Sequence, residues 1–392
     1  MATPDTATDP VRFWYTLALT GGVGRALLRR VLDSRDQPRS LEHLASLVAD
    51  RDPALARALR SPEADVDRTI DGALDWARDP AQHLISIDHP AYPALLRQID
   101  DPPPVLHVRG SLDGLSRPML AIVGSRQASL DGLRIARDMA AELGRCGLVI
   151  GSGLAAGIDL AAHRGAIEVG APSIAVVGTG IDRCYPASHQ GTADQIVEQA
   201  GAVVSELPLG APPLPHHFPR RNRLIAGLAR GVLVVQAARR SGSLITARLA
   251  LDYGRDVLAV PGSIHSSLHK GCHQLIREGA ALVESAADVL AALFGPAPMA
   301  QPDLFASRPA SVSPSISGGG LLSVARDGAT GGLGGPSGHS LLDRLGWSPI
   351  EPDRIALAAG LGPGETAQLL LELELEGLLE RLADGRLQRR TP

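Results

Sequence analysis

The chain has 392 residues with a formal net charge of -4 at pH 7; 44% of the residues are hydrophobic and 20% are charged. A chain of this size and composition can bury a large core and should divide into about two to four globular domains. No run approaches the roughly eighteen apolar residues of a membrane span, and the acidic opening MATPDTATDP is unlike a basic secretory leader. We therefore expect a cytoplasmic protein with no membrane partner, whose three unevenly spaced cysteines are free thiols: Cys146, Cys184 and Cys272.

Residues 1–80 predict a helical domain. The stretch FWYTLALTGGVGRALLRRVLDS reads as two short amphipathic helices joined at Gly21, Gly22 and Gly24, because glycine permits the positive φ of a tight turn. Helical sequence continues to about Trp76. The pattern is of the helix-hairpin-helix or SAM-like kind. Known hairpins of this kind offer backbone N–H groups to a phosphate, but we favour a small packing domain here. Residues 81–117, which include the proline-dense HPAYPALLRQIDDPPPVLHVRG, predict a connector.

Residues 118–294 predict a Rossmann-like α/β domain. Short apolar runs, each followed by a glycine turn and a helical stretch, recur through this region. Because the runs are continuous rather than alternating, both faces of each strand are expected to be buried, as in a parallel sheet covered by helices. The runs are LAIVGS (120–125), LVIGSG (148–153), IAVVGTG (174–180), AVVSEL (202–207), VLVVQA (232–237), DVLAVPG (256–262) and ALVES (281–285).

Two further segments follow the α/β region. Residues 295–340 are rich in Gly, Pro, Ser and Ala, and such a composition buries too little apolar surface to offset the entropy of ordering it, so we predict a flexible linker. Residues 341–392 recover helical patterning in LLDRLG, EPDRIALAAG and GETAQLLLELELEGLLERL, and ADGRLQRR places a turn at Asp384 and Gly385. Three helices and a hairpin predict a winged helix.

Ligands of open parallel sheets bind at the carboxyl ends of the strands, so the residues that follow each run are candidates for a site. Glycine allows close approach there, serine donates hydrogen bonds, and arginine binds phosphate with a fixed fork. A backbone that opens a helix, as in SGLAAGID, offers further N–H groups to an anion. The candidates in the three turns are Gly124, Ser125 and Arg126, then Ser152 and Gly153, then Arg240, Ser241, Gly242 and Ser243.

A basic, acid-free interval supports an anionic ligand. No acidic residue lies between Glu206 and Asp252, whereas this interval contains Arg220, Arg221, Arg223, Arg230, Arg239, Arg240 and Arg248. Solvation of a helix face is the alternative, but the length of the interval favours nucleic-acid binding. Phe218 stands in a proline-rich turn beside these arginines. An aromatic ring there can stack on a base while arginines hold the backbone.

Other chemistries have weaker signals. The only lysine is Lys270, so the GxxxxGK[ST] phosphate loop is absent. The segment GSGLAA matches a dinucleotide fingerprint, but it follows the second run and no acid closes the next strand. A metal could use the spacing of His265, His269, Cys272 and His273, although a phosphate-contacting loop suits that segment equally well. No catalytic triad or paired carboxylates stand out. We therefore expect no cofactor and no metal.

The chain closely resembles the DNA-processing protein A family (DprA or Smf) in segments that occur in this order: GSR, SGLAAGID, VVGTGID, FPRRNRLIAGLARGVLVVQAARRSGSLITARLAL, GRDVLAVPG and HQLIREGA. The match runs from about Tyr92 to Leu293, and the block from FPRRNR to SGSLITAR is highly specific. The resemblance implies a cytoplasmic, dimeric protein of natural transformation that binds and protects single-stranded DNA and loads the RecA recombinase onto it, without enzymatic activity.

The resemblance also assigns residues. Ser125 and Arg126 resemble strand-gripping residues of the first turn. The family's aromatic and RNR positions match Phe218, Arg221, Asn222 and Arg223, and its SGS turn matches residues 241–243. Asn222 and Arg223 begin a helical stretch, so a bracing role for Arg223 in the loop is the alternative to DNA contact. The chain departs from some members in having no lysine shortly before the phenylalanine, in PPLPHHF, and in having His273 where many have asparagine.

Two rival functions remain from the sequence. The glycine-rich turns vaguely resemble those of Rossmann-type phosphoribohydrolases. Those enzymes usually need a PGGxGTxxE loop with a catalytic glutamate, and the matching SGSLITARLAL contains no acid. A protein-binding scaffold is the other alternative, and it leaves the acid-free arginines unexplained.

Overall fold

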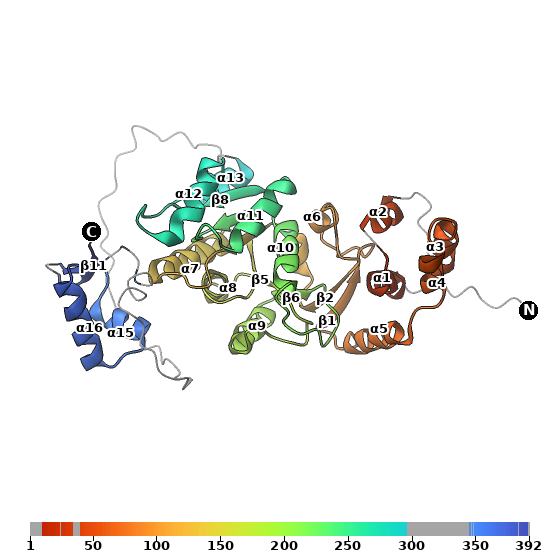
Figure 1. Ribbon diagram of the computed structural model, residues 1–392, viewed down its shortest axis with the longest axis horizontal. Helices are drawn as coiled ribbons and strands as arrows, with labels where there is room; N and C mark the ends of the chain where they lie inside the picture. The colour runs from red at the N-terminus through yellow and green to blue at the C-terminus, as the bar shows by residue number, and fades with distance from the viewer. Residues whose placement is uncertain are drawn as a thin grey trace, which may run out of the picture.

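The computed structural model describes residues 10–23, 25–33, 40–295, 345, 347, 349–382 and 384–390 (Figure 1). The predicted linker lies outside the described residues except for Gly295. Within the described part of the chain, no helix combines the length and the apolar character that crossing a membrane would require.

The N-terminal helical domain is confirmed. Its helices are α1 (Pro10–Leu19), α2 (Arg25–Asp33), α3 (Leu41–Val48), α4 (Pro53–Arg60) and α5 (Ala64–Trp76). Gly22 adopts a φ of +89° in the turn after α1, as the predicted tight turn requires. The side chains of Ser40 and Asp52 cap α3 and α4 by accepting hydrogen bonds from backbone N–H groups.

The core of the molecule is a nine-stranded sheet with the order β1-β2-β6-β5-β4-β3-β7-β8-β9. The segment from β6 to β9 is parallel throughout, which confirms the Rossmann-like prediction. Its strands are β3 (Met119–Val123), β4 (Val149–Ser152), β5 (Ser173–Val176), β6 (Ala202–Ser205), β7 (Gly231–Val234), β8 (Asp256–Ala259) and β9 (Ala281–Leu282).

Helices cover both faces of this sheet, as the continuous apolar runs predict. Along β3, Leu120 and Ile122 pack on one face with α7 and α8, while Ala121 and Val123 pack on the other with α10 and α11. The helices are α7 (Leu130–Arg145), α8 (Ile158–Glu168), α9 (Gln190–Glu198), α10 (His217–Leu228), α11 (Ser243–Asp252), α12 (Lys270–Arg277) and α13 (Ala286–Phe294), and 3-10 turns span Ala187–His189 and Ser267–His269.

The segment predicted as a connector differs from that expectation. It contains β1 (Gln82–Ser86), the short helix α6 (Ala94–Arg97), β2 (Val105–Gly110) and a 3-10 turn (Asp113–Ser116). β1 pairs antiparallel with β2, and β2 pairs antiparallel with β6, so both strands extend the sheet. The prolines that suggested a connector lie between the two strands. The hydroxyl of Tyr15 lies 2.8 Å from Nε2 of His107 on β2, which links α1 to the sheet.

The C-terminal winged helix is confirmed in its described part. It consists of α15 (Pro352–Ala359), α16 (Pro363–Leu375) and the antiparallel strands β10 (Leu379–Arg381) and β11 (Leu387–Arg389). Gly385 forms the predicted turn with a φ of +83°. Most of the predicted helix LLDRLG lies outside the described residues. A separate small core holds the domain together, with Leu345, Ile350, Ile355, Leu370, Leu373, Leu379 and Leu387.

Candidate functional site

The carboxyl ends of four neighbouring strands, in the order β5-β4-β3-β7, carry most of the candidate residues. We call the strand ends and the turns that follow them the carboxyl rim: residues 124–126, 152–153, 177–185 and 237–243. The beginning of α10 packs against this rim, because its Phe218 and Arg221 contact residues of the turns after β5 and β4.

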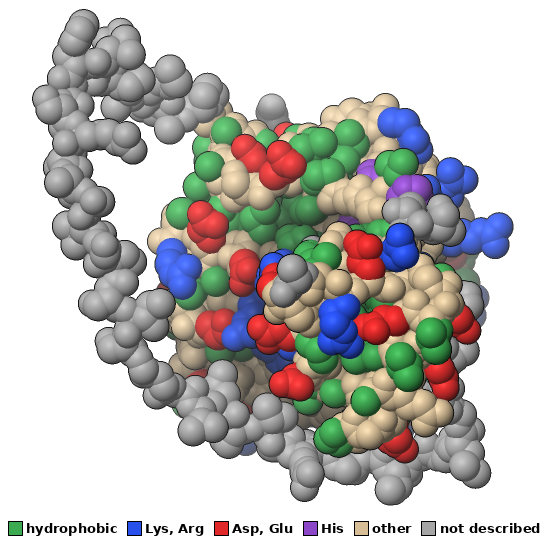
Figure 2. Space-filling view, turned by 90° about the vertical axis from the view of Figure 1, so that its left-hand side faces the viewer, with side chains coloured by type: hydrophobic (Ala, Val, Ile, Leu, Met, Phe, Trp, Pro, Cys, Tyr) green, Lys and Arg blue, Asp and Glu red, His purple; other side chains and the backbone are tan. Residues whose placement is uncertain are grey.

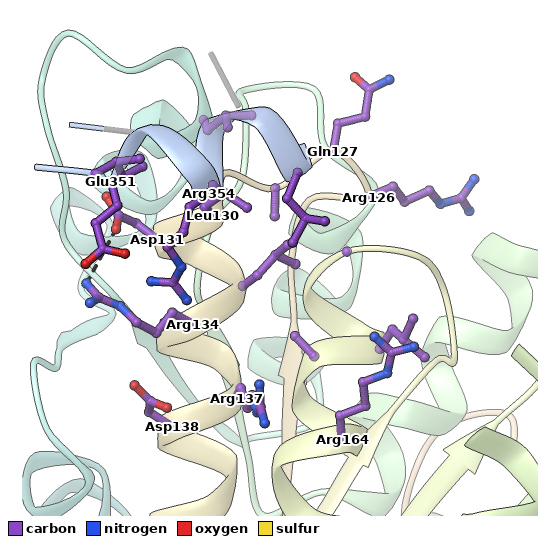
Figure 3. A pocket seen from close by; sticks show the side chains of 18 of the residues that line it. Arg126, Gln127, Leu130, Asp131, Arg134, Arg137, Asp138, Arg164, Glu351 and Arg354 are labelled. Carbon is purple, nitrogen blue, oxygen red and sulfur yellow. Dashed lines mark hydrogen bonds and ion pairs between the residues drawn. The ribbon is translucent and has the colours of Figure 1, made fainter. Parts of the chain in front are cut away.

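The turn after β3 presents Arg126. Gly124 is tightly enclosed, since a Cβ there would lie 2.6 Å from Cγ1 of Ile158 and 2.8 Å from the carbonyl oxygen of Gln236. The N–H of Ser125 donates to that same carbonyl at 2.7 Å, and its hydroxyl accepts from the N–H of Gln127 at 3.1 Å. Arg126 itself is exposed and projects from the turn away from α7 (Figure 3). The turn is therefore anchored while its charged side chain faces solvent.

Gln236 anchors this turn from inside, and the sequence analysis missed it. Its side chain is buried, accepts a hydrogen bond from the N–H of Ser129 at 3.0 Å and donates to the hydroxyl of Ser129 at 2.8 Å. Ser129 in turn caps α7. A glutamine inside the apolar run VLVVQA was the available signal, because a buried amide needs partners that fix its surroundings.

Phe218 lies close to both Arg126 and Tyr185. The guanidinium carbon of Arg126 is 5.7 Å from the centroid of the partly exposed Phe218 ring. The centroid of the Tyr185 ring is 5.6 Å away on the turn after β5. A Cβ on Gly178 would lie 3.1 Å from Cδ1 of Phe218, so the ring rests on the backbone of that turn. The turns after β3 and β5 and the start of α10 thus form one surface of aromatic rings and positive charge.

Arg221 is buried, which differs from the expectation of a direct ligand contact. It is 5% exposed, and Nη1 donates to the carbonyl oxygens of Gly153, at 2.6 Å, and of Val176. Burial lowers the pKa of Arg221 to about 10, while the nearby carboxylate of Asp159 opposes that shift. Burial also raises the pKa of Asp159. Arg221 therefore joins the ends of β4 and β5 from within.

The turn after β4 is buried as well. Ser152 is fully buried, and its hydroxyl donates to the carbonyl oxygen of Ile122 at 2.6 Å. The N–H of Gly153 donates to the carboxylate of Asp159 at 3.1 Å. A Cβ on Gly153 would lie 2.5 Å from Nη1 of Arg221, so only glycine leaves room for that guanidinium. These two predicted contact residues shape the rim rather than line its surface.

Arg223 is likewise engaged inside the protein. Nη2 of Arg223 forms an ion pair with Glu206 at the end of β6, and Nη1 donates to the carbonyl oxygen of Asp101. The side chains of Arg223 and Glu206 are 8% and 6% exposed. Burial raises the pKa of Glu206, while the positive charges of Arg223 and then Arg220 oppose that rise. Arg223 thereby fixes α10 to β6.

The remaining candidates on α10 and after β7 are mostly accessible. Arg220 is 59% exposed and pairs with Glu206 at 3.3 Å, and the partly exposed Asn222 accepts a hydrogen bond from Nε of Arg221 at 3.3 Å. Arg240 and Gly242 are exposed. The hydroxyls of Ser241 and the buried Ser243 lie 2.7 Å apart at the start of α11.

The histidines after β8 do not gather around a common point. His269 is buried, with Nε2 3.4 Å from the amide nitrogen of Gln236, while Nε2 of His273 is 3.0 Å from the carbonyl oxygen of Gly262. Cys272 points toward backbone carbonyls of β7, and burial raises its pKa to about 12. Among the described residues, no three His, Cys, Asp or Glu side chains are placed to hold a metal ion.

Comparison with known proteins points to one family. Residues 83–294 match the model for DNA recombination-mediator protein A, and residues 336–385 match the model for the DprA winged helix domain. Protein Smf of Escherichia coli is 47% identical over 223 residues, which cover 57% of this chain but only 60% of that protein. DNA processing protein DprA of Streptococcus pneumoniae is 43% identical over 282 residues, covering 71% of this chain and 96% of that protein.

A solved structure supports the same relationship. The X-ray structure of DNA processing protein A from Streptococcus pneumoniae has 40% sequence identity and a TM-score of 0.62 with this chain. It covers 72% of this chain and 98% of the solved one.

Proposed function

This chain belongs to the DNA-processing protein A (DprA/Smf) family, and from that premise we propose that it binds single-stranded DNA along the carboxyl rim. The observation that carries the proposal is the surface formed by Arg126, Phe218 and Tyr185. Accessible arginine and partly exposed aromatic rings are the two components that single-strand-binding sites combine, since bases stack on rings while cations neutralise the backbone. Arg240 and the Ser241 turn extend this surface past β7.

Within this site the arginines divide into two roles. Arg126, Arg220 and Arg240 are exposed and take the phosphates. Arg221 and Arg223 are buried, so they position the turns and α10 that carry Phe218.

At the level of the cell, we propose that the protein protects incoming strands and loads the RecA recombinase onto them during natural transformation, working as a dimer. The matching family model describes a DNA recombination mediator, which supports this role. A binding role is favoured over phosphoribohydrolase activity because α11, which follows the turn after β7, has no acidic residue in its first turn.

A titration with short oligonucleotides tests the proposal. Single-stranded oligonucleotides are expected to bind more tightly than duplexes of the same sequence, and the affinity should fall as salt rises because phosphate neutralisation releases counterions. A parallel assay should detect no nucleotide hydrolysis. Equal affinity for single strands and duplexes would contradict the proposed site.

The Arg126→Ala variant is expected to lose about tenfold or more in affinity for single-stranded DNA, because a charge-assisted hydrogen bond contributes roughly 1.5–3 kcal/mol. The salt slope, which is the slope of the logarithm of the binding constant against the logarithm of the salt concentration, should become shallower by about 0.7 for each lost phosphate contact. The measurement is a gel-shift titration at several salt concentrations. Arg145→Ala is a matched control, since Arg145 is also exposed but lies at the other end of α7; equal affinities of the two variants would remove Arg126 from the site.

The winged helix is not expected to read DNA. Its helix α16 contains Glu365, Glu372 and Glu374 and no basic residue, so phosphates would repel it. The arginines near the chain end are engaged within the domain: Arg386 pairs with Asp384, Arg390 with Glu380, and Arg389 lies over Trp347. On the face shown in Figure 2, acidic side chains are spread over much of the surface. We infer that the domain binds protein or regulates.

Ending the chain near Gly318, in the predicted linker outside the described residues, is therefore expected to leave single-stranded-DNA affinity within about threefold of the full chain, or roughly 0.7 kcal/mol. The two proteins are compared in the same titration at one salt concentration. A hundredfold loss in the truncated protein would show that the winged helix forms part of the DNA site.

A further inference from the structure

Tyr185 is a half-exposed aromatic residue that neither the sequence pattern nor the family resemblance singled out. The residue is 49% exposed, although it lies beside Phe218 with 5.6 Å between the ring centroids. Aromatic residues make up only 3% of the chain. Two adjacent rings left accessible on the carboxyl rim are therefore a distinctive feature, because rings of this size usually contribute to stability by burial.

The loop that carries Tyr185 is held by two hydrogen bonds to the loop after β6. The N–H of Gly180 donates to the carbonyl oxygen of Ala211 at 3.0 Å, and the carboxylate of Asp182 accepts from the N–H of Gly210 at 2.8 Å. These contacts tie the loop after β5 to the loop after β6. The ring of Tyr185 is thus presented by a fixed scaffold, so little conformational entropy is lost when a ligand stacks on it.

The arrangement of the two rings determines what they can hold. Their planes are inclined by 44°, and their centroids are farther apart than the roughly 3.4 Å between stacked bases of one DNA strand. Two bases that rest on the two rings cannot remain stacked on each other. Paired bases inside a duplex are stacked, so only an unpaired strand can adopt this arrangement.

We propose that Tyr185 is a second base-stacking residue and that Tyr185 and Phe218 together hold two neighbouring bases of single-stranded DNA, unstacked from each other. The inference rests on the proposed function and deepens it, because it gives the site a physical reason to prefer single strands. The guanidinium of Arg126, 5.7 Å from the Phe218 ring centroid, adds the positive charge that a phosphate needs to the same surface.

Full-length variants at Tyr185 test this inference with a thymidine oligonucleotide. Tyr185→Ala and Tyr185→Leu are expected to weaken binding roughly 5- to 150-fold, the range for one lost base–aromatic contact. The salt slope should not change, since stacking releases no counterions. Tyr185→Phe should bind like the wild type, because the ring is retained. If Tyr185 only shields its neighbours, leucine fills the volume and restores affinity, which would overturn the inference.

Phe294 provides a matched control. Phe294 is also 49% exposed, and Cζ of Arg230 lies 4.8 Å from its ring centroid. Arg230 directly precedes β7, so this pair lies at the amino ends of the strands, away from the carboxyl rim. Phe294→Ala should leave binding unchanged. If Phe218→Ala weakens binding while Tyr185→Ala keeps the same affinity as Phe294→Ala, this inference fails and the proposed function stands. If the wild type does not prefer single strands, the proposed function itself fails.

Oligonucleotides with abasic positions distinguish the base held by Tyr185 from the base held by Phe218. In the shortest oligonucleotide that keeps full affinity, removing the base at either of two adjacent positions should weaken wild-type binding. In the Tyr185→Ala variant, removing the base at one of these positions should cause no further loss of affinity. In the Phe218→Ala variant, removing the base at the other position should cause no further loss. If both substitutions abolished the effect of removing the same base, the two-base arrangement would be contradicted.

Discussion

Replacing Arg223 with alanine is expected to lower the free energy of unfolding by about 3–5 kcal/mol, the usual result of removing one partner from a buried ion pair. The variant leaves the carboxylate of Glu206 buried without Arg223, its best-placed cation. Urea unfolding followed by circular dichroism measures the change. Arg220→Ala is the matched control, because Arg220 pairs with the same carboxylate but is 59% exposed. Its loss should cost no more than about 1 kcal/mol.

The stability deficit of Arg223→Ala should also depend on pH. Burial already raises the pKa of Glu206 in the folded protein, and losing Arg223 removes the largest opposing influence. A carboxyl group whose pKa is raised by folding binds its proton more tightly in the folded state, so stability falls as pH rises. The deficit should therefore be smallest where Glu206 is protonated and should grow toward neutral pH. A deficit independent of pH, or equal deficits for both arginine variants, would contradict the buried pair.

Replacing Phe218 with alanine is expected to weaken single-stranded-DNA binding by about 1–3 kcal/mol, or roughly 5- to 150-fold, because one base loses its stacking partner. The salt slope should stay nearly unchanged, in contrast to Arg126→Ala. Gel-shift titrations at several salt concentrations measure both quantities. Thermal unfolding of the same variant provides the control: a lower melting temperature with unaltered binding would make Phe218 a packing residue of the Gly178 turn.

The parallel core could be predicted well because strands that are buried on both faces have continuous apolar runs in the sequence. Each apolar run from Leu120 onward became a strand, and the glycine turns lie at the carboxyl ends, as strand direction requires. The two antiparallel strands within 81–117 escaped prediction because the prolines between them resemble those of a connector. Here local propensity was uninformative, and pairing with β6 determined the structure.

The candidate site was predicted in composition but not in accessibility. Arg220, Arg221 and Arg223 look alike in sequence, yet the first is exposed and the other two are buried. Burial of an arginine depends on acceptors far away in the chain, such as the carbonyl of Gly153 or the carboxylate of Glu206. The local sequence around each arginine does not identify these distant acceptors. The contact between Tyr185 and Phe218 likewise joins a loop to a distant helix.

Along the proposed site, the strand order β5-β4-β3-β7 sets the length of DNA that one copy of the protein can contact. Neighbouring strands lie about 4.8 Å apart, so the three intervals from the Tyr185 turn to the Ser241 turn span about 14 Å. That length matches about four nucleotides at the 3.4 Å repeat of a stacked strand, and fewer once the bases are separated. If a strand runs along the carboxyl rim as we propose, one copy of the protein contacts only a short tract, and covering a long strand requires many copies.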